Sequence, residues 1–267
     1  MVTSSVRPTD WNSEAYHRLS EPQYQWGLKM LKVLAVRGDE HILDAGCGSG
    51  KLTAELLKRL PQGRVIAVDL SENMVGAARE FLKPQFGAQI LCMHSDLCEL
   101  ALEKVADGVF SAATFHWVSD RGKMFERLCA ALKPGGWFVA QAGGGRTLEG
   151  FWRIADAVLL HEPFAEHLKG FKRQQDYLDA EITREQMQAA GFADIDVKLQ
   201  DAPVKFPDEA SFREFIRTVN LKNHVERLPA ELRERLLDEV AEESMGSELP
   251  LTLDYQRINL RAKRDVR

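Results

Sequence analysis

The sequence predicts an α/β fold in which a doubly wound, mainly parallel sheet carries helices on both faces. Short apolar runs alternate with segments of helical spacing between residues 41 and 141. Each run has the length of a buried strand and ends in turn residues or a helix start. Strands that alternate with helices in this way pair in parallel, and the helices cover both faces of the sheet.

The expected elements of the first half follow one another closely. Leucines at helical spacing indicate one or two helices within residues 14–36. Pro61 ends one helix, and Ser71 is a candidate N-cap for the next. The expected strands are 41–45, 64–69, 88–94, 108–114 and 137–141. The expected helices are 51–60, 71–82 and 123–132.

The second half is expected to add helical insertions and two more strands. The helices are predicted at 151–178, 183–190, 209–218 and 229–243, and the strands at 193–206 and 251–262. No linker rich in Pro, Gly or Ser separates the halves, so we expect one domain over residues 1–267. Within it, residues 1–37 would form lid helices, 38–145 the ligand-binding core, and 146–267 the acceptor-side insertions with the last two strands.

Composition argues against several classes of function. The net charge of −5 disfavours a nucleic-acid partner, because such proteins usually carry a basic face. No apolar run approaches the roughly 18 residues of a membrane span, and residues 1–11 lack the pattern of a secretory signal. The four cysteines form no Cys-x-x-Cys pair. We therefore expect a cytoplasmic protein, monomeric or homodimeric, that binds no metal ion and no membrane and acts on a small molecule.

The most specific signal is a glycine-rich turn, Leu43–Gly50, directly after the first strand. Glycines allow a tight turn and close approach to a ligand, and the following helix start favours a ligand anion. The dinucleotide fingerprint would place its third glycine one residue later, and no Gly-Lys-Ser/Thr of a P-loop follows. Gly46, Cys47, Gly48 and Gly50 are therefore candidate ligand contacts, with a purely structural turn as the alternative.

Two aspartates follow the next two strands at the same edge. Asp69 ends the second strand and could accept both hydroxyls of a ribose; its alternative role is the N-cap of the next helix. Asp96 follows the third strand and could accept an adenine amino group, with a turn-forming role as the alternative. Leu97 would offer a backbone N–H to the ring, and Met74 could lie flat against it. The adjacent residues Leu70 and Ser95 complete the candidate set.

Together these motifs resemble the class I methyltransferases that use S-adenosylmethionine (SAM). Leu132–Trp137 also matches, as the turn into the family's fifth strand. The resemblance covers about residues 40–142. It implies a seven-stranded Rossmann-like sheet of order 3-2-1-4-5-7-6 with an antiparallel seventh strand and a helical lid. It also implies SAM as the methyl donor, S-adenosylhomocysteine (SAH) as the product, and no metal.

Within that superfamily the flanks resemble the trans-aconitate methyltransferase group and, more loosely, juvenile hormone acid methyltransferases. The matching stretches are Asp10–Asn12 with Tyr16, and Phe115–Val118 after the fourth strand, where Phe115 is a cofactor candidate. In such enzymes the opening helix closes over the methyl donor. The lid candidates are Trp11, Tyr16, Gln25 and Trp26, of which Trp26 would face the acceptor. This finer resemblance implies a small acid as the acceptor.

His116 and Trp117 follow the fourth strand, at the edge where open α/β sheets bind ligands. A carboxylate acceptor needs no base, whereas an alcohol, phenol or protonated amine would need one, and His116 is the candidate. Lining the pocket is the alternative role for both residues. Arg146 could bind an anionic acceptor, with an exposed surface charge as its alternative.

The sequence thus predicts an enzyme that moves a methyl group from SAM to a small molecule, preferably to a carboxylate or another oxygen. A nitrogen or carbon methyltransferase acting on a small metabolite is one alternative. A catalytically silent SAM-binding subunit and an NAD-dependent dehydrogenase are the others.

Overall fold

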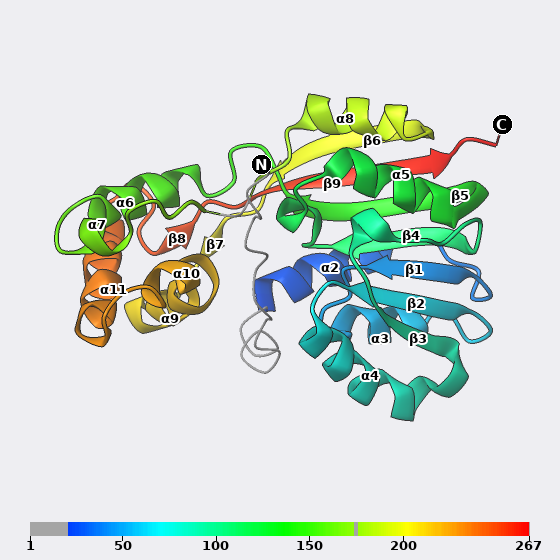
Figure 1. The fold of residues 1–267 in the computed structure, drawn as a ribbon, viewed down its shortest axis with the longest axis horizontal. Coiled ribbons are helices and arrows are strands. Elements are labelled where there is room, and N and C mark those ends of the chain that lie inside the picture. Colours follow the sequence, from blue (N-terminus) through cyan, green and yellow to red (C-terminus); the bar gives the residue numbers. More distant parts are fainter. Residues whose placement is uncertain (1–20, 174–175, 267) are drawn as a thin grey trace. The chain divides into compact units, whose positions relative to one another are not determined.

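The computed structural model describes residues 21–173 and 176–266, and it confirms the predicted sheet (Figure 1). Seven strands pair in the order β3-β2-β1-β4-β5-β9-β6, and β9 is antiparallel. The strands are β1 His41–Ala45, β2 Arg64–Asp69, β3 Ile90–His94, β4 Ala106–Ala112, β5 Leu132–Gly143, β6 Phe192–Asp201 and β9 Gln256–Arg264. This is the expected order 3-2-1-4-5-7-6, because β7 (Val204–Lys205) and β8 (Thr252–Leu253) form a separate antiparallel pair.

The parallel register brings the carboxyl ends of the central strands to one edge. On β1, Asp44 lies opposite Ala67 of β2 and Phe110 of β4. Asp69 at the end of β2 lies opposite His94 at the end of β3. Residues that follow these strands in the sequence are therefore neighbours in space, which positions the glycine turn and the two later loops beside one another.

Helices cover both faces of the sheet, and each face has its own apolar core (Figure 1). Neighbouring residues of a strand point to opposite faces, so Ile42 packs in one core and Leu43 in the other. One face carries α2 (Glu21–Val33), α3 (Lys51–Leu57) and α4 (Glu72–Phe86), and the other carries α5 (Arg121–Ala131) and α8 (Ala180–Ala189). Short helical turns η1 (Gly87–Gln89), η2 (Leu97–Glu99) and η3 (Phe115–Trp117) follow α4, β3 and β4.

The described chain divides into two compact units. The sheet unit comprises the described residues up to Ala142, Leu178–Lys198 and those from Ile258 onward. The helical unit comprises Gly143–Tyr177 and Leu199–Arg257. It contains α6 Glu149–Leu159, α7 Phe164–His167, α9 Glu209–Phe215, the π-helical turn η4 Ile216–Asn220, α10 Lys222–Val225, α11 Ala230–Met245 and the β7–β8 pair. A single domain over the whole chain stays a prediction.

The second half departs from the sequence-based element boundaries. The helix expected at 151–178 is two helices, α6 and α7, and Pro163 is the N-cap of the second. Proline has no N–H to continue a helix, which explains the break. The expected helix 209–218 ends at Phe215 and continues as the π-helical turn η4. Each of the two late strands is interrupted by a short bend, so that the β7–β8 pair separates from the main sheet.

Among residues 21–173 and 176–266, no helix has both the length and the apolar character that crossing a bilayer requires. The cytoplasmic location and the monomeric or homodimeric state stay predictions.

Candidate functional site

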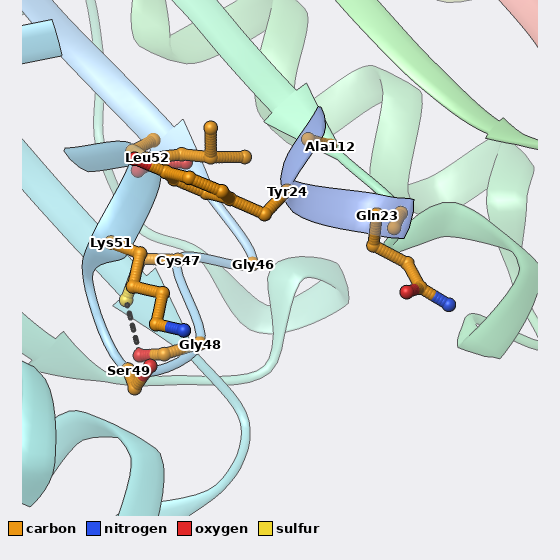
Figure 2. A pocket seen from close by; sticks show the side chains of 11 residues that line it. Gln23, Tyr24, Gly46, Cys47, Gly48, Ser49, Lys51, Leu52 and Ala112 are labelled. Atoms are coloured by element: carbon orange, nitrogen blue, oxygen red, sulfur yellow. Dashed lines mark hydrogen bonds between the residues drawn. The ribbon is translucent and has the colours of Figure 1, made fainter. Parts of the chain in front are cut away.

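A pocket lies beside the glycine turn at the carboxyl edge of the sheet (Figure 2). The space between its lining residues is about 520 Å³, a volume that includes open solvent. Its lining residues are Gln23, Tyr24, Asp44, Gly46, Cys47, Gly48, Ser49, Lys51, Leu52, Ala112 and Ala113. The lining therefore comes from α2, the end of β1, the glycine turn, the start of α3 and the end of β4.

The glycines of the turn adopt a backbone that side chains disfavour. Gly46, Gly48 and Gly50 have φ angles of +84°, +53° and +86°. A Cβ at Gly46 would lie 2.1 Å from Oγ1 of Thr114, whereas a Cβ at Gly48 would meet no atom within 4 Å. Packing against the loop after β4 thus requires glycine at 46, while position 48 faces open space where a ligand can approach the backbone.

The backbone amides of the turn are used within the protein. The N–H groups of Gly46 and Cys47 both donate to the Val68 carbonyl, at 2.8 and 2.9 Å. The N–H of Gly48 donates to the Asp69 carboxylate at 2.8 Å. The turn crosses the end of β2, so the Val68 carbonyl and the Asp69 carboxylate accept N–H groups that we had expected to contact a ligand. The role of the turn in ligand binding stays a prediction.

Asp69 joins the glycine turn to the start of α4. One carboxylate oxygen accepts the Gly48 N–H, and the other accepts the Ser71 N–H at 2.9 Å. Burial raises the pKa of Asp69, and these two hydrogen bonds oppose the rise. Ser71 is the N-cap of α4, since its side chain accepts the Met74 N–H at 3.3 Å. The alternative capping role therefore belongs to Ser71, and the carboxylate oxygens of Asp69 keep lone pairs for further donors.

Asp44 is a site residue that the sequence analysis missed. It is 2% exposed and lines the pocket from the end of β1. Burial raises its pKa to about 7; the hydrogen bond from Oγ1 of Thr53, at 2.6 Å, opposes the rise and the charge of Asp69 adds to it. A buried carboxylate is costly unless a cation or several donors face it. The signal available in the sequence was one acidic residue inside an apolar strand next to the glycine turn.

The helix α2 borders the pocket from the other side. A Cβ at Gly27 would lie 2.2 Å from a methyl carbon of Leu52, so glycine at 27 lets α2 approach α3 closely. Figure 2 shows the Tyr24 ring beside Leu52, and the Lys51 amine lies 5.7 Å from the centre of that ring. The Oε1 atom of Gln23 is buried and has no hydrogen-bond partner within the described part of the chain.

The lid candidates are placed differently from one another. Gln25 is exposed and Trp26 is half-buried on α2, and neither is among the lining residues of this pocket. Their neighbours Gln23 and Tyr24 take that place, because the helix turns by about 100° per residue. Trp11 and Tyr16 lie outside the described residues. The roles proposed for these four side chains stay predictions.

The loop after β3 meets the end of β2. The N–H of Ser95 donates to the backbone oxygen of Asp69 at 3.1 Å. Asp96 caps η2 by accepting the Cys98 N–H at 2.9 Å, which is the turn-forming role, and Leu97 is buried behind it. A carboxylate with one such bond can accept others, so the turn contact and a ligand contact are compatible. Of the remaining candidates, Met74 is buried on α4 and Leu70 is exposed.

The three candidate residues on the loop after β4 differ in burial. Phe115 is 1% exposed and packs in the core against Phe125 and Phe138, at 5.8 and 6.1 Å between ring centres. Its side chain is therefore part of the core, and the cofactor contact expected of Phe115 stays a prediction. His116 and Trp117 are half-buried on η3, with ring centres 5.3 Å apart.

Arg146 lies in the helical unit, where its side chain is 81% exposed. Its guanidinium pairs with Glu149 at 2.6 Å, the arrangement of a surface charge. In the part of the chain that the structure describes, no group of three or more His, Cys, Asp or Glu side chains could hold a metal ion.

We expect Gly46→Ala to unfold at lower urea concentration than Gly48→Ala. Both variants carry the cost of a positive φ, about 1–2 kcal/mol, but only position 46 adds a clash with Thr114. Gly76→Ala is the control, because a Cβ there meets no atom within 4 Å and alanine suits the interior of α4. Equal losses at 46 and 48 would contradict the packing role of Gly46.

Comparisons with known proteins agree with this geometry. A family model described as a methyltransferase domain matches residues 42–136, which contain β1 to β4 and the glycine turn. Trans-aconitate 2-methyltransferase of Variovorax paradoxus is 30% identical over 250 residues, which cover 93% of this chain and 94% of that protein. A malonyl-[acyl-carrier protein] O-methyltransferase of Brevibacillus brevis is 27% identical over 228 residues, 83% of this chain and 80% of that protein.

A solved structure shows the same fold. Phosphoethanolamine N-methyltransferase 2 of Haemonchus contortus, in complex with SAH, superposes with a TM-score of 0.63 at 22% identity. The match covers 97% of this chain and 59% of that one. On the match to the Variovorax enzyme, which covers 93% of this chain, the chain belongs to the class I SAM-dependent methyltransferases, in the family that includes trans-aconitate 2-methyltransferase.

Proposed function

We propose that this methyltransferase transfers the methyl group of SAM to a carboxylate oxygen of a small acid. The observation that carries the proposal is the length of the match to the Variovorax enzyme, which covers 93% of this chain and so extends into the helical unit. That relative is named for trans-aconitate, a tricarboxylic acid, and the Brevibacillus relative is named as an O-methyltransferase. Both names favour an oxygen acceptor over nitrogen or carbon.

The pocket residues suit the parts of SAM. We assign the buried Asp44 carboxylate to the ammonium group, because burial raises its pKa and the hydroxyl of Thr53 donates a hydrogen bond to it. The lone pairs that Asp69 keeps would accept the ribose hydroxyls, and Asp96 with Leu97 would hold the adenine. Gly48 leaves the space above the turn open to the ligand. When bound, SAM supplies a methyl group on a positively charged sulfur.

A carboxylate acceptor needs to be oriented and shielded from water, but it needs no general base. A carboxylate oxygen would form its bond to the methyl carbon while the bond from that carbon to the sulfur breaks, and the electron pair of that bond would stay on the sulfur of SAH. The ionised oxygen has no proton to lose, so no side chain has to act as a base. Most of the acceleration can come from orienting the acceptor and excluding water. We assign orientation to His116 and Trp117, which are half-buried beside the end of β4.

Purified enzyme incubated with SAM should form methyl esters from small carboxylic acids and release SAH. Mass spectrometry of reactions with trans-aconitate, tricarballylate, a primary amine and a phenol measures this directly. Ester formation with the acids alone is the expected result. An N-methyl product without any ester would contradict the proposal, and SAM binding without turnover on any acceptor would favour the silent subunit.

SAM affinity should rise with pH between about pH 5.5 and 7.5 and then level off. Asp44, with its pKa of about 7 in the free protein, must lose its proton to face an ammonium group. Below that pKa, each unit of pH therefore raises the affinity up to about tenfold. Calorimetry on wild type and Asp44→Asn tests this. The variant should bind SAM weakly with a flat pH profile, and an unchanged slope would assign the titration to another group.

His116→Ala should change kcat by less than about threefold and raise the KM of the acceptor instead. A general base contributes about 100-fold or more to the rate, so its removal would lower kcat by that factor. Steady-state kinetics with an acid acceptor and calorimetry with SAM separate the two roles. A loss of about 100-fold in kcat at unchanged SAM affinity would establish His116 as a base and would argue for a protonated acceptor.

A further inference from the structure

The helix α2 forms one wall of the pocket beside the glycine turn. Its residues Gln23 and Tyr24 line that pocket, together with Lys51 and Leu52 from the start of α3 (Figure 2). The helix has 13 residues and carries Gly27 in its interior. A helix of that length is only marginally stable by itself, and an internal glycine lowers its stability further. Contacts with other parts of the chain therefore decide where α2 lies.

Arg59 binds the C-terminal end of α2. Its guanidinium donates one N–H to the carbonyl of Leu31, in the last turn of the helix, and another to the carbonyl of Leu34, directly after it, at 2.6 Å. The last carbonyls of a helix have no N–H partner within the helix, and a positive charge is favourable beside them. The guanidinium is also planar, with its donors at fixed angles. Two such bonds from one rigid group therefore fix the end of the helix in both position and direction.

The segment that carries Arg59 is itself held in place. It follows α3, and the backbone N–H of Arg59 donates to the Leu56 carbonyl at 3.0 Å. Nε2 of Gln89 donates to the carbonyls of Leu60 and Gly63, at 2.9 and 3.1 Å. Arg59 is half-buried. It therefore joins α2 to a fixed part of the sheet unit and not to a loose surface loop.

Two contacts nearer the pocket join α2 to α3. Glycine at 27 lets the backbone of α2 approach the Leu52 side chain closely, and the Lys51 amine lies 5.7 Å from the centre of the Tyr24 ring. The guanidinium contact lies roughly 10 Å further along the axis of α2, at a rise of about 1.5 Å per residue. Contacts at both ends of one helix fix its tilt and its rotation. Because neighbouring side chains differ by about 100° in direction, a modest rotation of α2 would turn Tyr24 away from the pocket.

We propose that Arg59 is a positioning residue for SAM binding. By holding the end of α2 against the segment after α3, it keeps Gln23 and Tyr24 at the pocket. Arg59 is not itself among the lining residues, so it acts through α2. The inference rests on the proposed function in one respect, because it takes the pocket beside the glycine turn to be the SAM site. Its effect is on the affinity for SAM and not on the transfer step.

A second arginine of the sheet unit makes the same kind of contact away from the pocket. Nη1 of Arg264 donates to the carbonyls of Cys129, Ala130 and Leu132, at 3.1, 2.9 and 2.6 Å, at the C-terminal end of α5. Arg264 is half-buried, as Arg59 is, and α5 contributes no lining residue to the pocket. Arg264→Gln is therefore the matched control for Arg59→Gln.

Calorimetry of the full-length chain with SAM and with SAH measures the effect. Arg59→Gln should weaken the binding of both at least about tenfold, whereas Arg264→Gln should change it by less than about twofold. Both variants lose hydrogen bonds at a helix end, so both should lower the thermal midpoint. Arg59→Lys keeps the positive charge and should recover part of the lost affinity. In steady-state assays with saturating acid, Arg59→Gln should raise the KM for SAM and leave kcat within about threefold of wild type.

A double-variant measurement shows whether Arg59 acts through α2. Tyr24→Leu removes a ring that lines the pocket and should weaken SAM binding by itself. If Arg59 works by placing Tyr24, then Arg59→Gln should weaken SAM binding less in the Tyr24→Leu background than in the wild type. Combining Tyr24→Leu with Arg264→Gln should show no such difference. Equal effects of Arg59→Gln in both backgrounds would overturn the inference.

The outcomes separate this inference from the proposed function. Methyl ester formation with a KM for SAM that Arg59→Gln leaves unchanged would overturn the inference and leave the function intact. An equal loss of SAM affinity in Arg59→Gln and Arg264→Gln would assign the effect to general stability and would also overturn the inference. Weaker SAM binding in Arg59→Gln alone, with no ester formed from any acid, would support the inference and overturn the function. If Arg59→Gln fails to fold, Arg59→Lys against Arg264→Lys makes the same comparison.

Discussion

The Asp69 carboxylate is the interaction on which the candidate site depends. It stands at the end of β2 and accepts one N–H from the glycine turn and one from the start of α4, while its backbone oxygen accepts an N–H from the loop after β3. Three loops are thus held around one residue. Parallel pairing makes this possible, because the ends of neighbouring strands meet at one edge. A ligand at that edge would meet three loops that hydrogen bonds to Asp69 already hold together.

The same edge concentrates negative charge in a poorly solvated place. Burial raises the pKa of both Asp44 and Asp69, and the negative charge of Asp69 raises the pKa of Asp44 further. Such an arrangement is unfavourable in the free protein and favourable beside a cation. SAM carries an ammonium and a sulfonium group, so the electrostatic cost of these carboxylates is consistent with the cofactor of the family.

The two compact units differ in the features that they contain. The sheet unit carries the glycine turn and the aspartates, and the family model matches within it. The Haemonchus enzyme shares this fold at 22% identity. In the helical unit, Phe151 of α6 packs against Phe212 of α9, and Oδ1 of Asn220 and Nδ1 of His224 are buried without a hydrogen-bond partner among the described residues.

The sequence alone determined the strands β1 and β2 to the residue, the Ser71 cap of α4 and, through the family resemblance, the sheet order and the cofactor. These follow from local periodicity, capping and a contiguous motif. Only the tertiary structure decided that Gly46 and Cys47 donate to Val68, that Asp44 lines the pocket, and that Gln23 and Tyr24 face it instead of Gln25 and Trp26. Those outcomes depend on contacts between residues far apart in the chain and on the rotation of α2, and neither leaves a local pattern in the sequence.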